Sequence, residues 1–496
     1  MSIKNLLSSA VFVAAGVVCA HGLEVEVAAP GTLSESVTDP SAVTQLTLSG
    51  TVNAADLYYI GMNMTGLTSL DMSRVTIDEY MGTVVMGRTF YPAATLPYGV
   101  FMGLPLTSVT LPQQSGLVIS EGAFMNTSLT SLPTFENVDS IGQAAFAGCN
   151  SLQTLTMPKT KMNSAVFADC TALTTVDLGT ATEIPALTFH GCTALTTING
   201  AANIVSIGDR AFEGDTSLKT FDFGQNLRYV GSSAFAATGL TEIDMSRALK
   251  LEEINREAFA DSKLQSAILP DNVATIGDGV FFGNNSMKEI QLPAALITLG
   301  EHSLVSTRLR EIKLPDNVEE IGAYALKGQT NITGIYLPPS LIYIGDNGME
   351  GMTALSRIDV RDHTSVPELG ENVWEGVNPS KVFVTVNANY INDFENALQW
   401  KDFNFNIIAG AEEIVDDQTA GRNVRGRFVG TDLQIESTGA DIDIVRLFDT
   451  AGRLLLSVEP RSTTATIDTS DFPGGVFIVN IVLDDKTPAT LKLARK

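Results

Sequence analysis

The chain has 496 residues, 44% hydrophobic and 18% charged, which is enough apolar material for a packed interior and too little charge for a disordered chain. This length exceeds what one ordinary hydrophobic core supports, so we expect several domains or one elongated repeat array. The net charge of −25 argues against nucleic acid or anionic lipid as a partner, because a polyanion would be repelled.

The N-terminus is predicted to be a secretory signal peptide, residues 1–20. In MSIKNLLSSAVFVAAGVVCAHG, Lys4 precedes an apolar stretch from Leu6 to Val18, which ends in the small-residue exit Val18-Cys19-Ala20. The stretch is short for a membrane span, and no later apolar run is long enough, so the mature chain should be soluble or surface-attached. Lipid attachment at Cys19 is the weaker alternative, because Val18 stands where Gly or Ala is usual.

A sequence repeat of about 23 residues then recurs along the chain, as in IGQAAFAGCNSLQTLTMP from Ile141. It consists of Ile-Gly, two variable residues, Ala-Phe and a Leu-x-x-Ile-x-Leu-Pro run. Its apolar anchor returns at intervals of 21 to 25 residues, which indicates about thirteen coils that bury their apolar faces against one another. The anchors are Phe101, Phe124, Phe146, Phe167, Phe189, Phe212, Phe235, Phe259, Phe281, Leu304, Leu326, Met349 and Trp374.

Each coil should contain one short strand and one tight turn. Leu-x-x-Ile-x-Leu has the alternation of a strand, and the Pro or Asp-Asn that follows ends it. The Ile-Gly-x-x-Ala-Phe half is too short for a long helix and is predicted to be a tight turn, or a single helical turn, that inserts its Phe. The expected fold is a mainly β solenoid whose stacked strands form one broad curved face.

The pattern over residues 101–375 resembles the leucine-rich repeats of BspA-like (treponemal-type) bacterial surface proteins. The resemblance implies an N-terminal cap with the first strands in residues 21–100, where Leu67, Leu70 and Met72 begin the strand series. It also implies a C-terminal cap in residues 376–410. Caps are physically required, because an uncapped end would expose apolar side chains and a free sheet edge.

The tail differs from the repeats. Residues 411–428 carry dense charge without apolar periodicity and are predicted to be a linker. In residues 429–496, short alternating segments separated by turn residues predict a small β-sandwich. Residues 421–496 hold ten Lys plus Arg and ten Asp plus Glu, so the acidity lies upstream of the tail.

The same tail resembles the C-terminal sorting domain of the type IX secretion system of Bacteroidota. The resemblance implies passage across the outer membrane, removal of the domain by a cut in the linker, and release or attachment to surface lipopolysaccharide. A permanent β-sandwich that itself binds a ligand is the alternative. The matching residues are Val445, Leu447, Asp449, Gly452, Arg453, Phe472, Pro473, Gly474, Gly475, Phe477 and Lys492.

Three cysteines remain after the predicted signal, and they occupy one equivalent position. Cys149, Cys170 and Cys192 each lie three residues after an anchor, so they should stack in consecutive coils. Small buried side chains are the favoured interpretation, ahead of a disulfide or a metal site.

No catalytic, cofactor-binding or metal-binding residue is predicted, and no cofactor is expected. HExxH, GxSxG, P-loop and GxGxxG motifs are not apparent, and the four histidines share no repeated position. A carboxylate pair for glycoside hydrolysis, drawn from different coils, and a calcium site at Asp416 and Asp417 are less favoured alternatives to surface acidity and a solvated linker. The histidines are His21, His190, His302 and His363.

The variable positions of the strand motif should point outward. In the N-terminal half they are mainly a ladder of Thr and Ser, and in the C-terminal half they become charged. A row of hydroxyl groups supplies hydrogen bonds but lacks the aromatic side chains that usually dominate binding energy. Two interpretations are therefore equally favoured: the threonines bind a ligand, or they are present only because Thr favours the β conformation. The first group is Thr107, Ser108, Thr110, Gln153, Thr154, Thr156, Thr174, Thr175, Asp177, Thr196, Thr197 and Asn199. The second group is Lys219, Asp222, Glu242, Asp244, Lys288, Glu289, Arg310, Glu311, Lys313 and Tyr336.

The expected function is a non-catalytic cell-surface or secreted binding protein. The resemblance implies adhesion through the curved repeat face to host matrix proteins or bacterial surface proteins, with the type IX machinery as the partner of the tail. A carbohydrate-binding surface protein is the alternative, and polysaccharide is its ligand class. A hydrolase has no support from the sequence.

Overall fold

The computed structural model describes residues 22–305, 307–408, 424–450, 452–484 and 488–495. These residues belong to two compact units, Met1–Thr241 and Glu242–Lys496. The predicted signal peptide, His21, and residues 411–423 of the predicted linker lie outside the described residues.

The first unit opens with a cap in which parallel strands are covered by short helices. Helix α2 begins at a capping box, in which the Asn53 side chain accepts a hydrogen bond from the Ala55 amide and the Asp56 side chain accepts one from the Asn53 amide. The buried Asp56 carboxylate also accepts from the amides of Gly31 and Leu33, so its charge is well compensated. The cap elements are β1 (Leu23–Val27), α1 (Leu33–Ser36), η1 (Pro40–Ala42), β2 (Gln45–Val52), α2 (Ala54–Asn63) and β3 (Ser69–Ile77).

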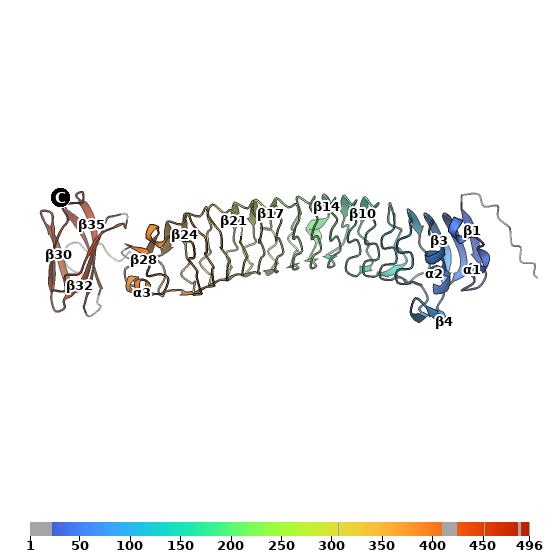
Figure 1. Cartoon of the computed structure of the whole chain (residues 1–496), viewed down its shortest axis with the longest axis horizontal. Helices are drawn as coiled ribbons and strands as arrows, with labels where there is room; N and C mark the ends of the chain where they lie inside the picture. Colours follow the sequence, from blue (N-terminus) through green and yellow to red (C-terminus); the bar gives the residue numbers. More distant parts are fainter. Residues whose placement is uncertain (1–21, 306, 409–423, 451, 485–487, 496) are drawn as a thin grey trace, which may run out of the picture. The chain divides into compact units, whose positions relative to one another are not determined.

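A two-stranded antiparallel hairpin follows the cap. Strands β4 (Tyr80–Val85) and β5 (Arg88–Tyr91) pair only with each other among the described strands, and Figure 1 shows the hairpin standing off from the coils. Residues 21–100 were predicted to be a cap with the first strands, and this hairpin was not anticipated.

The coils of the repeat region form two rows of parallel strands, although, within the described residues, three coils, those that follow the anchors Phe124, Phe212 and Leu304, contribute no strand to the first row. The Leu-x-x-Ile-x-Leu segments form the row that we call the strand face, as predicted, and its neighbours pair in register, for example Val176 with Ile198. In the first unit this row contains β3, β7 (Ser108–Thr110), β10 (Thr154–Thr156), β12 (Thr175–Asp177) and β14 (Thr197–Asn199). In the second unit it contains β17 (Glu242–Asp244), β19 (Ser266–Ile268), β21 (Glu289–Gln291), β24 (Gly334–Tyr336), β26 (Arg357–Val360), β28 (Phe383–Asn387) and β29 (Asn404–Ile408).

The second row of strands was not predicted. It lies just before the Gly of the Ile-Gly pair, in the half of each coil that was expected to be turn alone. In the first unit the row contains β6 (Thr95–Leu96), β8 (Leu117–Ile119), β9 (Val138–Ile141), β11 (Lys161–Met162), β13 (Glu183–Ile184), β15 (Ser206–Ile207) and β16 (Tyr229–Val230). In the second unit it contains β18 (Glu253–Ile254), β20 (Thr275–Ile276), β22 (Thr298–Leu299), β23 (Glu320–Ile321), β25 (Tyr343–Ile344) and β27 (Glu368–Leu369).

The Gly of the Ile-Gly pair is required by close approach of the neighbouring coil. A Cβ atom on Gly208 would lie 2.4 Å from the backbone nitrogen of Ala186, and one on Gly345 would lie 2.5 Å from that of Ala323. At these two positions a side chain would collide with the preceding coil, so Gly lets the coils approach to hydrogen-bonding distance there, whereas Ser120 and Asn163 occupy the equivalent position in other coils and still donate to the preceding coil.

The thirteen predicted anchors are all buried, which confirms the repeat register. In the first unit the phenylalanine rings stack on one another, as in Phe124 and Phe146, whose centroids are 5.2 Å apart and nearly parallel. In the second unit Phe259 and Phe281 stack in the same way at 5.9 Å. The rings therefore form the continuous apolar interior that each coil alone could not provide.

The repeat ends in an aromatic cap in the second unit. The buried rings of Trp374 and Trp400 meet edge to face at 5.3 Å, and Phe394 and Phe403 pack against them. The other elements here are η3 (Pro379–Lys381) and α3 (Ile391–Asn396), and η2 (Ala201–Asn203) lies in the first unit.

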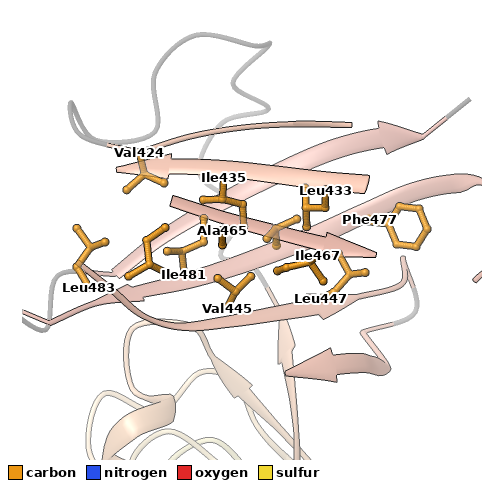
Figure 2. Packing of buried hydrophobic residues seen from close by; sticks show 12 residues of the cluster. Val424, Leu433, Ile435, Val445, Leu447, Ala465, Ile467, Phe477, Ile481 and Leu483 are labelled. Atoms are coloured by element: carbon orange, nitrogen blue, oxygen red, sulfur yellow. The ribbon is translucent and has the colours of Figure 1, made fainter. Parts of the chain in front are cut away.

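The C-terminal strands form two antiparallel sheets with the orders β30-β31-β34 and β33-β32-β35-β36, as predicted for a small β-sandwich. Figure 2 shows the apolar side chains between them, including Leu433, Val445 and Phe477. Strand β30 begins at Val424, inside the segment predicted as linker up to residue 428. Arg425 and Arg427 hid the alternation, because each stands next to one of the inward residues, the buried Val424 and the partly buried Phe428. The strands are β30 (Val424–Val429), β31 (Asp432–Ser437), β32 (Ile442–Phe448), β33 (Leu454–Val458), β34 (Thr464–Asp468), β35 (Gly475–Leu483) and β36 (Pro488–Arg495).

Candidate functional site

The outward positions of the strand face lie where the sequence placed them. In the first unit Thr107, Thr154, Thr156 and Asp177 are exposed, while the alternate residues are buried, as at Leu155. Exposure alone does not make these side chains available, however, because part of the ladder is used within the protein.

In several coils the first outward residue of the strand motif is a threonine that donates its hydroxyl to the preceding coil. Thr107 Oγ1 donates to the Thr68 carbonyl at 3.0 Å, Thr174 Oγ1 to the Gln153 carbonyl at 3.0 Å, and Thr196 Oγ1 to the Thr174 carbonyl at 3.1 Å. These hydroxyls tie coils together, which supports a structural role for this column. Thr154 and Thr156 lie further along the strand motif, on the exposed side of β10, where they can contact a ligand.

The strand face is interrupted in the coil between the anchors Phe124 and Phe146. This coil contributes no strand to the row, which passes from β7 to β10 without one. The cause is visible in the sequence, since Leu129-Thr130-Ser131-Leu132-Pro133 reaches its Pro two residues earlier than the motif does. Proline has no amide hydrogen to donate, so the segment leaves the sheet and forms a loop.

This interruption creates a hollow of about 710 Å³ beside strand β10. It is lined by the loop Leu132–Glu136, by the outward threonines of β10 and β12, and by the segment that follows β10. The half-buried ring of Phe135 is held edge to face against the anchor Phe146 at 5.8 Å. The hollow is lined by Leu132, Pro133, Thr134, Phe135, Glu136, Thr154, Leu155, Thr156, Met157, Pro158, Lys159, Thr160, Thr175 and Asp177.

The hollow combines polar, apolar and charged side chains. Its hydroxyls donate and accept hydrogen bonds, and Phe135 with Met157 offers apolar contact. The lining carries Glu136, Asp177 and Lys159, so its charges sum to −1. We expect it to favour a ligand with at least one cationic group. Thr154, Thr156, Thr175 and Asp177 were predicted to point outward, but the loop was missed, and the shortened motif was the signal that could have revealed it.

The three cysteines stack as predicted and are free thiols, fully buried at one equivalent position. Cys170 Sγ donates to the carbonyl of Phe146 at 3.4 Å, and Cys192 Sγ donates to that of Phe167 at 3.3 Å. Burial raises the pKa of both thiols. The cysteines thus serve as hydrogen-bond donors to the anchor carbonyls of the preceding coil.

Other coils place different polar residues at this position, three residues after the anchor, and we call the series the polar spine. Asn284 Nδ2 donates to the Phe259 carbonyl at 2.8 Å, and Gln329 Nε2 donates to the Leu304 carbonyl at 2.7 Å. The buried members are Thr127, Cys149, Cys170, Cys192, Asp215 and Thr238 in the first unit, and Ser262, Asn284, Thr307 and Gln329 in the second.

Asp215 is the one ionisable carboxyl group of the polar spine. Its side chain is fully buried, and neither carboxyl oxygen has a hydrogen-bond partner of normal geometry. Burial raises the pKa of Asp215 well above its usual value, and the nearby backbone of Cys192 opposes this only in part. A carboxylate cannot donate to a carbonyl, so Asp215 fits the spine only as the neutral acid.

The described histidines lie in separate coils and serve packing. His302 stacks on Tyr324 with ring centroids 4.8 Å apart. His363 is buried, its Nε2 lies 3.2 Å from the Leu337 carbonyl, and burial lowers its pKa. His190 Nδ1 lies 3.4 Å from a carboxyl oxygen of Glu213. Within the described ranges, no cluster of three or more His, Cys, Asp or Glu side chains could hold a metal ion, and Asp416 and Asp417 lie outside them.

The tail residues singled out by the sequence are largely fold determinants. Val445 and Leu447 lie in the sandwich core, and the Arg453 guanidinium and amide bond the Asp449 carboxylate at 3.1 and 3.0 Å across the β32–β33 turn. The buried Arg495 donates to Thr469 and to the Phe472 carbonyl, which joins the last strand to the segment before β35. Lys492, by contrast, is exposed on β36.

Several solved structures are similar to the chain. A leucine-rich repeat protein from Bacteroides ovatus is 21% identical over 75% of this chain and 86% of that chain, with a TM-score of 0.47. A leucine-rich cell surface protein from Faecalibacterium prausnitzii is 23% identical over 58% and 86%, with a TM-score of 0.35. The pneumococcal vaccine antigen PcpA is 15% identical over 69% and 84%, with a TM-score of 0.35. A search of curated proteins found no significant match.

The family model of the BspA type leucine rich repeat region matches the repeats in six copies, over residues 94–199, 159–252 and 252–380. Together these matches run from residue 94 to residue 380, more than half of the 496-residue chain. None of the helices in the described ranges is long and apolar enough to cross a membrane. The chain belongs to the BspA-type leucine-rich-repeat family.

Proposed function

We propose that the protein is an exported, non-catalytic adhesion protein that binds a protein on a host or bacterial surface through the strand face of its repeats. The observation that carries the proposal is the hollow at the interruption of the strand face, where Phe135, Thr154 and Thr156 present apolar and hydrogen-bonding groups together. Repeat proteins commonly bind through such extended surfaces, and a cavity with a few convergent polar groups is the usual place for specificity.

The test uses the chain from residue 22 to residue 496, presented to immobilised fibronectin, laminin and collagen and to immobilised polysaccharides. Thr154→Arg and Thr156→Arg together place two long side chains in the hollow from exposed positions, so folding should be unaffected. We expect saturable binding to a protein that weakens at least about 10-fold in this variant. Thr197→Arg, on the exposed part of β14, is the matched control and should bind as the unaltered chain does.

The salt dependence of binding adds a second readout. The lining charges favour a cationic group on the ligand, so affinity should fall as ionic strength rises from about 0.05 to about 0.5 M. Binding that is equally strong in the double Arg variant would place the ligand elsewhere and refute the role of the hollow.

Carbohydrate binding is the second candidate, and the hollow supplies the observation that favours it. Phe135 lines it beside several hydroxyls, an arrangement that suits a sugar ring. Binding to polysaccharide alone, abolished by Phe135→Ser, would replace the adhesion proposal with this one.

We further propose a domain organisation for the chain. Residues 1–20 are a signal peptide, and residues 21–100 and 376–410 cap the repeats in residues 101–375. Residues 429–496 act as a type IX sorting domain, which the linker 411–428 joins to the repeats. The exposed Lys492 beside a tightly determined sandwich supports recognition of the tail's surface by the secretion machinery. In a bacterium that has this system, the full chain should reach the cell surface or the medium. A chain that ends at residue 410 should remain in the periplasm, and its export would refute the proposal.

A further inference from the structure

The β4–β5 hairpin exposes an unusual concentration of apolar side chains. Met81, Val84, Met86 and Phe90 are 74%, 67%, 53% and 48% exposed, although large apolar side chains normally avoid water. Met81 and Phe90 are direct cross-strand partners, so they share one face of the hairpin.

The hairpin is attached to its unit by the opposite face. Tyr91 is buried and packs against Tyr58 of α2 with ring centroids 5.8 Å apart, and its hydroxyl donates to the Val85 carbonyl at 2.7 Å. Tyr80 packs against the same Tyr91 ring at 6.3 Å. The apolar face is therefore not needed to hold the hairpin in place.

The residue at the tip of the hairpin, Met86, is unusual for the turn that it occupies. Val85 pairs with Arg88, so Met86 and Gly87 form a two-residue turn, and both have positive φ angles, 44° and 78°. Asn or Asp before Gly is the favoured pair in such a turn, because a larger side chain is strained there. A half-exposed Met at this position points to an apolar contact outside the unit.

The strand edges of the hairpin are also unprotected. Edge strands of soluble proteins are commonly blunted by Lys, Pro or clustered charge, whereas Arg88 is the only charged residue from Tyr80 to Tyr91, and Lys and Pro do not occur there. Neither strand pairs with a third strand in the part of the chain that the structure describes. Such an edge is a template on which the same strand of a second copy can pair around a twofold axis.

The exposed apolar side chains on and near the hairpin approach the area of a dimer interface. Met62 on α2, Tyr98 and Met102 are also about half exposed, and α2 adjoins this region because Tyr58 donates to the Tyr98 carbonyl at 2.8 Å. Seven such side chains at roughly 100 Å² each offer roughly 700 Å². A standard interface buries about 800 Å² per partner, so the patch approaches that size before any backbone pairing is included.

We infer that the hairpin is a self-association site, at which two copies of this chain pair their β4–β5 edges and bury Met81, Met86 and Phe90 against each other. The net charge of −25 per chain opposes the approach of two copies. Salt screens that repulsion without weakening apolar contact, so dimerisation should strengthen with ionic strength, the reverse of the trend expected for the hollow.

The experiment is sedimentation equilibrium of residues 22–496 from about 1 to about 100 μM at about 0.05 and about 0.5 M NaCl. We expect a monomer–dimer equilibrium that shifts toward dimer at high salt. Met81→Lys with Phe90→Lys should raise the dissociation constant at least about 30-fold, as loss of a hot-spot contact does. These lysines reduce the net negative charge, so a weaker dimer cannot be attributed to added long-range repulsion.

The control is Ile342→Lys, which adds the same charge at a position that is 62% exposed in the second unit. It should dimerise as the unaltered chain does, and circular dichroism should be unchanged in both variants. A monomer at the highest concentration in both salts, or a dimer that the hairpin lysines leave intact, overturns the inference. So does hairpin-dependent flotation with phosphatidylcholine vesicles by a monomeric chain, which would assign the hairpin to a lipid surface.

Discussion

Replacement of Asp215 by Asn should stabilise the protein, and the gain should grow with pH. The carboxyl group is fully buried without a hydrogen-bond partner, and Asn has nearly the same shape with no proton to gain or lose. Asn also supplies a donor, as Asn284 does at the equivalent position by bonding the Phe259 carbonyl.

The magnitude follows from the cost of keeping the acid neutral. An unperturbed Asp side chain has a pKa of 3.8, and burial raises the pKa of Asp215 well above that in the folded state. Between these two pKa values the folded chain holds a proton that the unfolded chain releases, so stability is lost by about 1.4 kcal/mol per pH unit as pH rises. The stabilising contribution of protonation is complete only below pH 3.8. At pH 7 the penalty removed by Asn therefore reaches at most about 4 kcal/mol.

The assay is urea unfolding followed by circular dichroism at pH 4, 5.5 and 7, combined with hydrogen exchange of the amides near residue 215. Exchange is included because a long repeat array need not unfold in one step. We expect little difference between Asp215→Asn and the unaltered chain at pH 4 and a clear gain in urea midpoint and protection at pH 7.

Two variants bracket this result. Asn284→Asp should produce the opposite change, with stability that falls as pH rises. Asp56→Asn should destabilise the cap, because the Asp56 carboxylate accepts hydrogen bonds from three backbone amides. A gain for Asp215→Asn that is equal at pH 4 and pH 7 would show that the carboxyl group is not held neutral and would refute the reasoning.

Three further predictions test other features. Gly208→Ala should cost about 1 to 3 kcal/mol in urea unfolding, because its Cβ would lie 2.4 Å from the backbone of Ala186, whereas Gly66→Ala, with its nearest contact at 3.8 Å, should be nearly neutral. The thiols of Cys149, Cys170 and Cys192 should react with Ellman's reagent at pH 8 only after denaturation, because burial raises their pKa, and rapid reaction of the folded chain would contradict their burial. Arg495→Ala should destabilise the C-terminal sandwich by about 3 kcal/mol in thermal unfolding, since it leaves Thr469 and the Phe472 carbonyl without their charged donor, while Lys492→Ala on the exposed side of the same strand should not.

The repeat could be predicted because its determinants are local and periodic. One large apolar anchor per coil, repeated every 21 to 25 residues, has no explanation other than stacking, and every anchor is buried. The second row of strands could not be predicted, because two residues before a Gly carry no alternation. Only the close approach of adjacent backbones, seen at Gly208 and Gly345, reveals that row.

The candidate site was half visible in the sequence. Outward threonines such as Thr154 and Thr156 follow from strand alternation, but their meeting with Phe135 depends on a neighbouring coil that leaves the sheet. The early Pro133 signals that departure, while the hollow it creates is a property of three coils together. The hairpin was missed for a related reason, since its residues Met81, Val84 and Phe90 look like core when exposure is unknown.

The polar spine also bears on how such a chain can change in length. Anchor carbonyls in both units accept a hydrogen bond from the coil that follows, and Cys, Asn and Gln all serve as the donor. At the equivalent position Thr127 and Thr307 donate to the anchor carbonyl of their own coil, so the bond between coils depends on which residue the following coil has there. Duplication or loss of a whole coil keeps such a bond where the new neighbour has Cys, Asn or Gln at this position, whereas insertion of part of a coil moves the donor away from the carbonyl. The spine thus favours evolution of the binding surface by gain and loss of complete repeats.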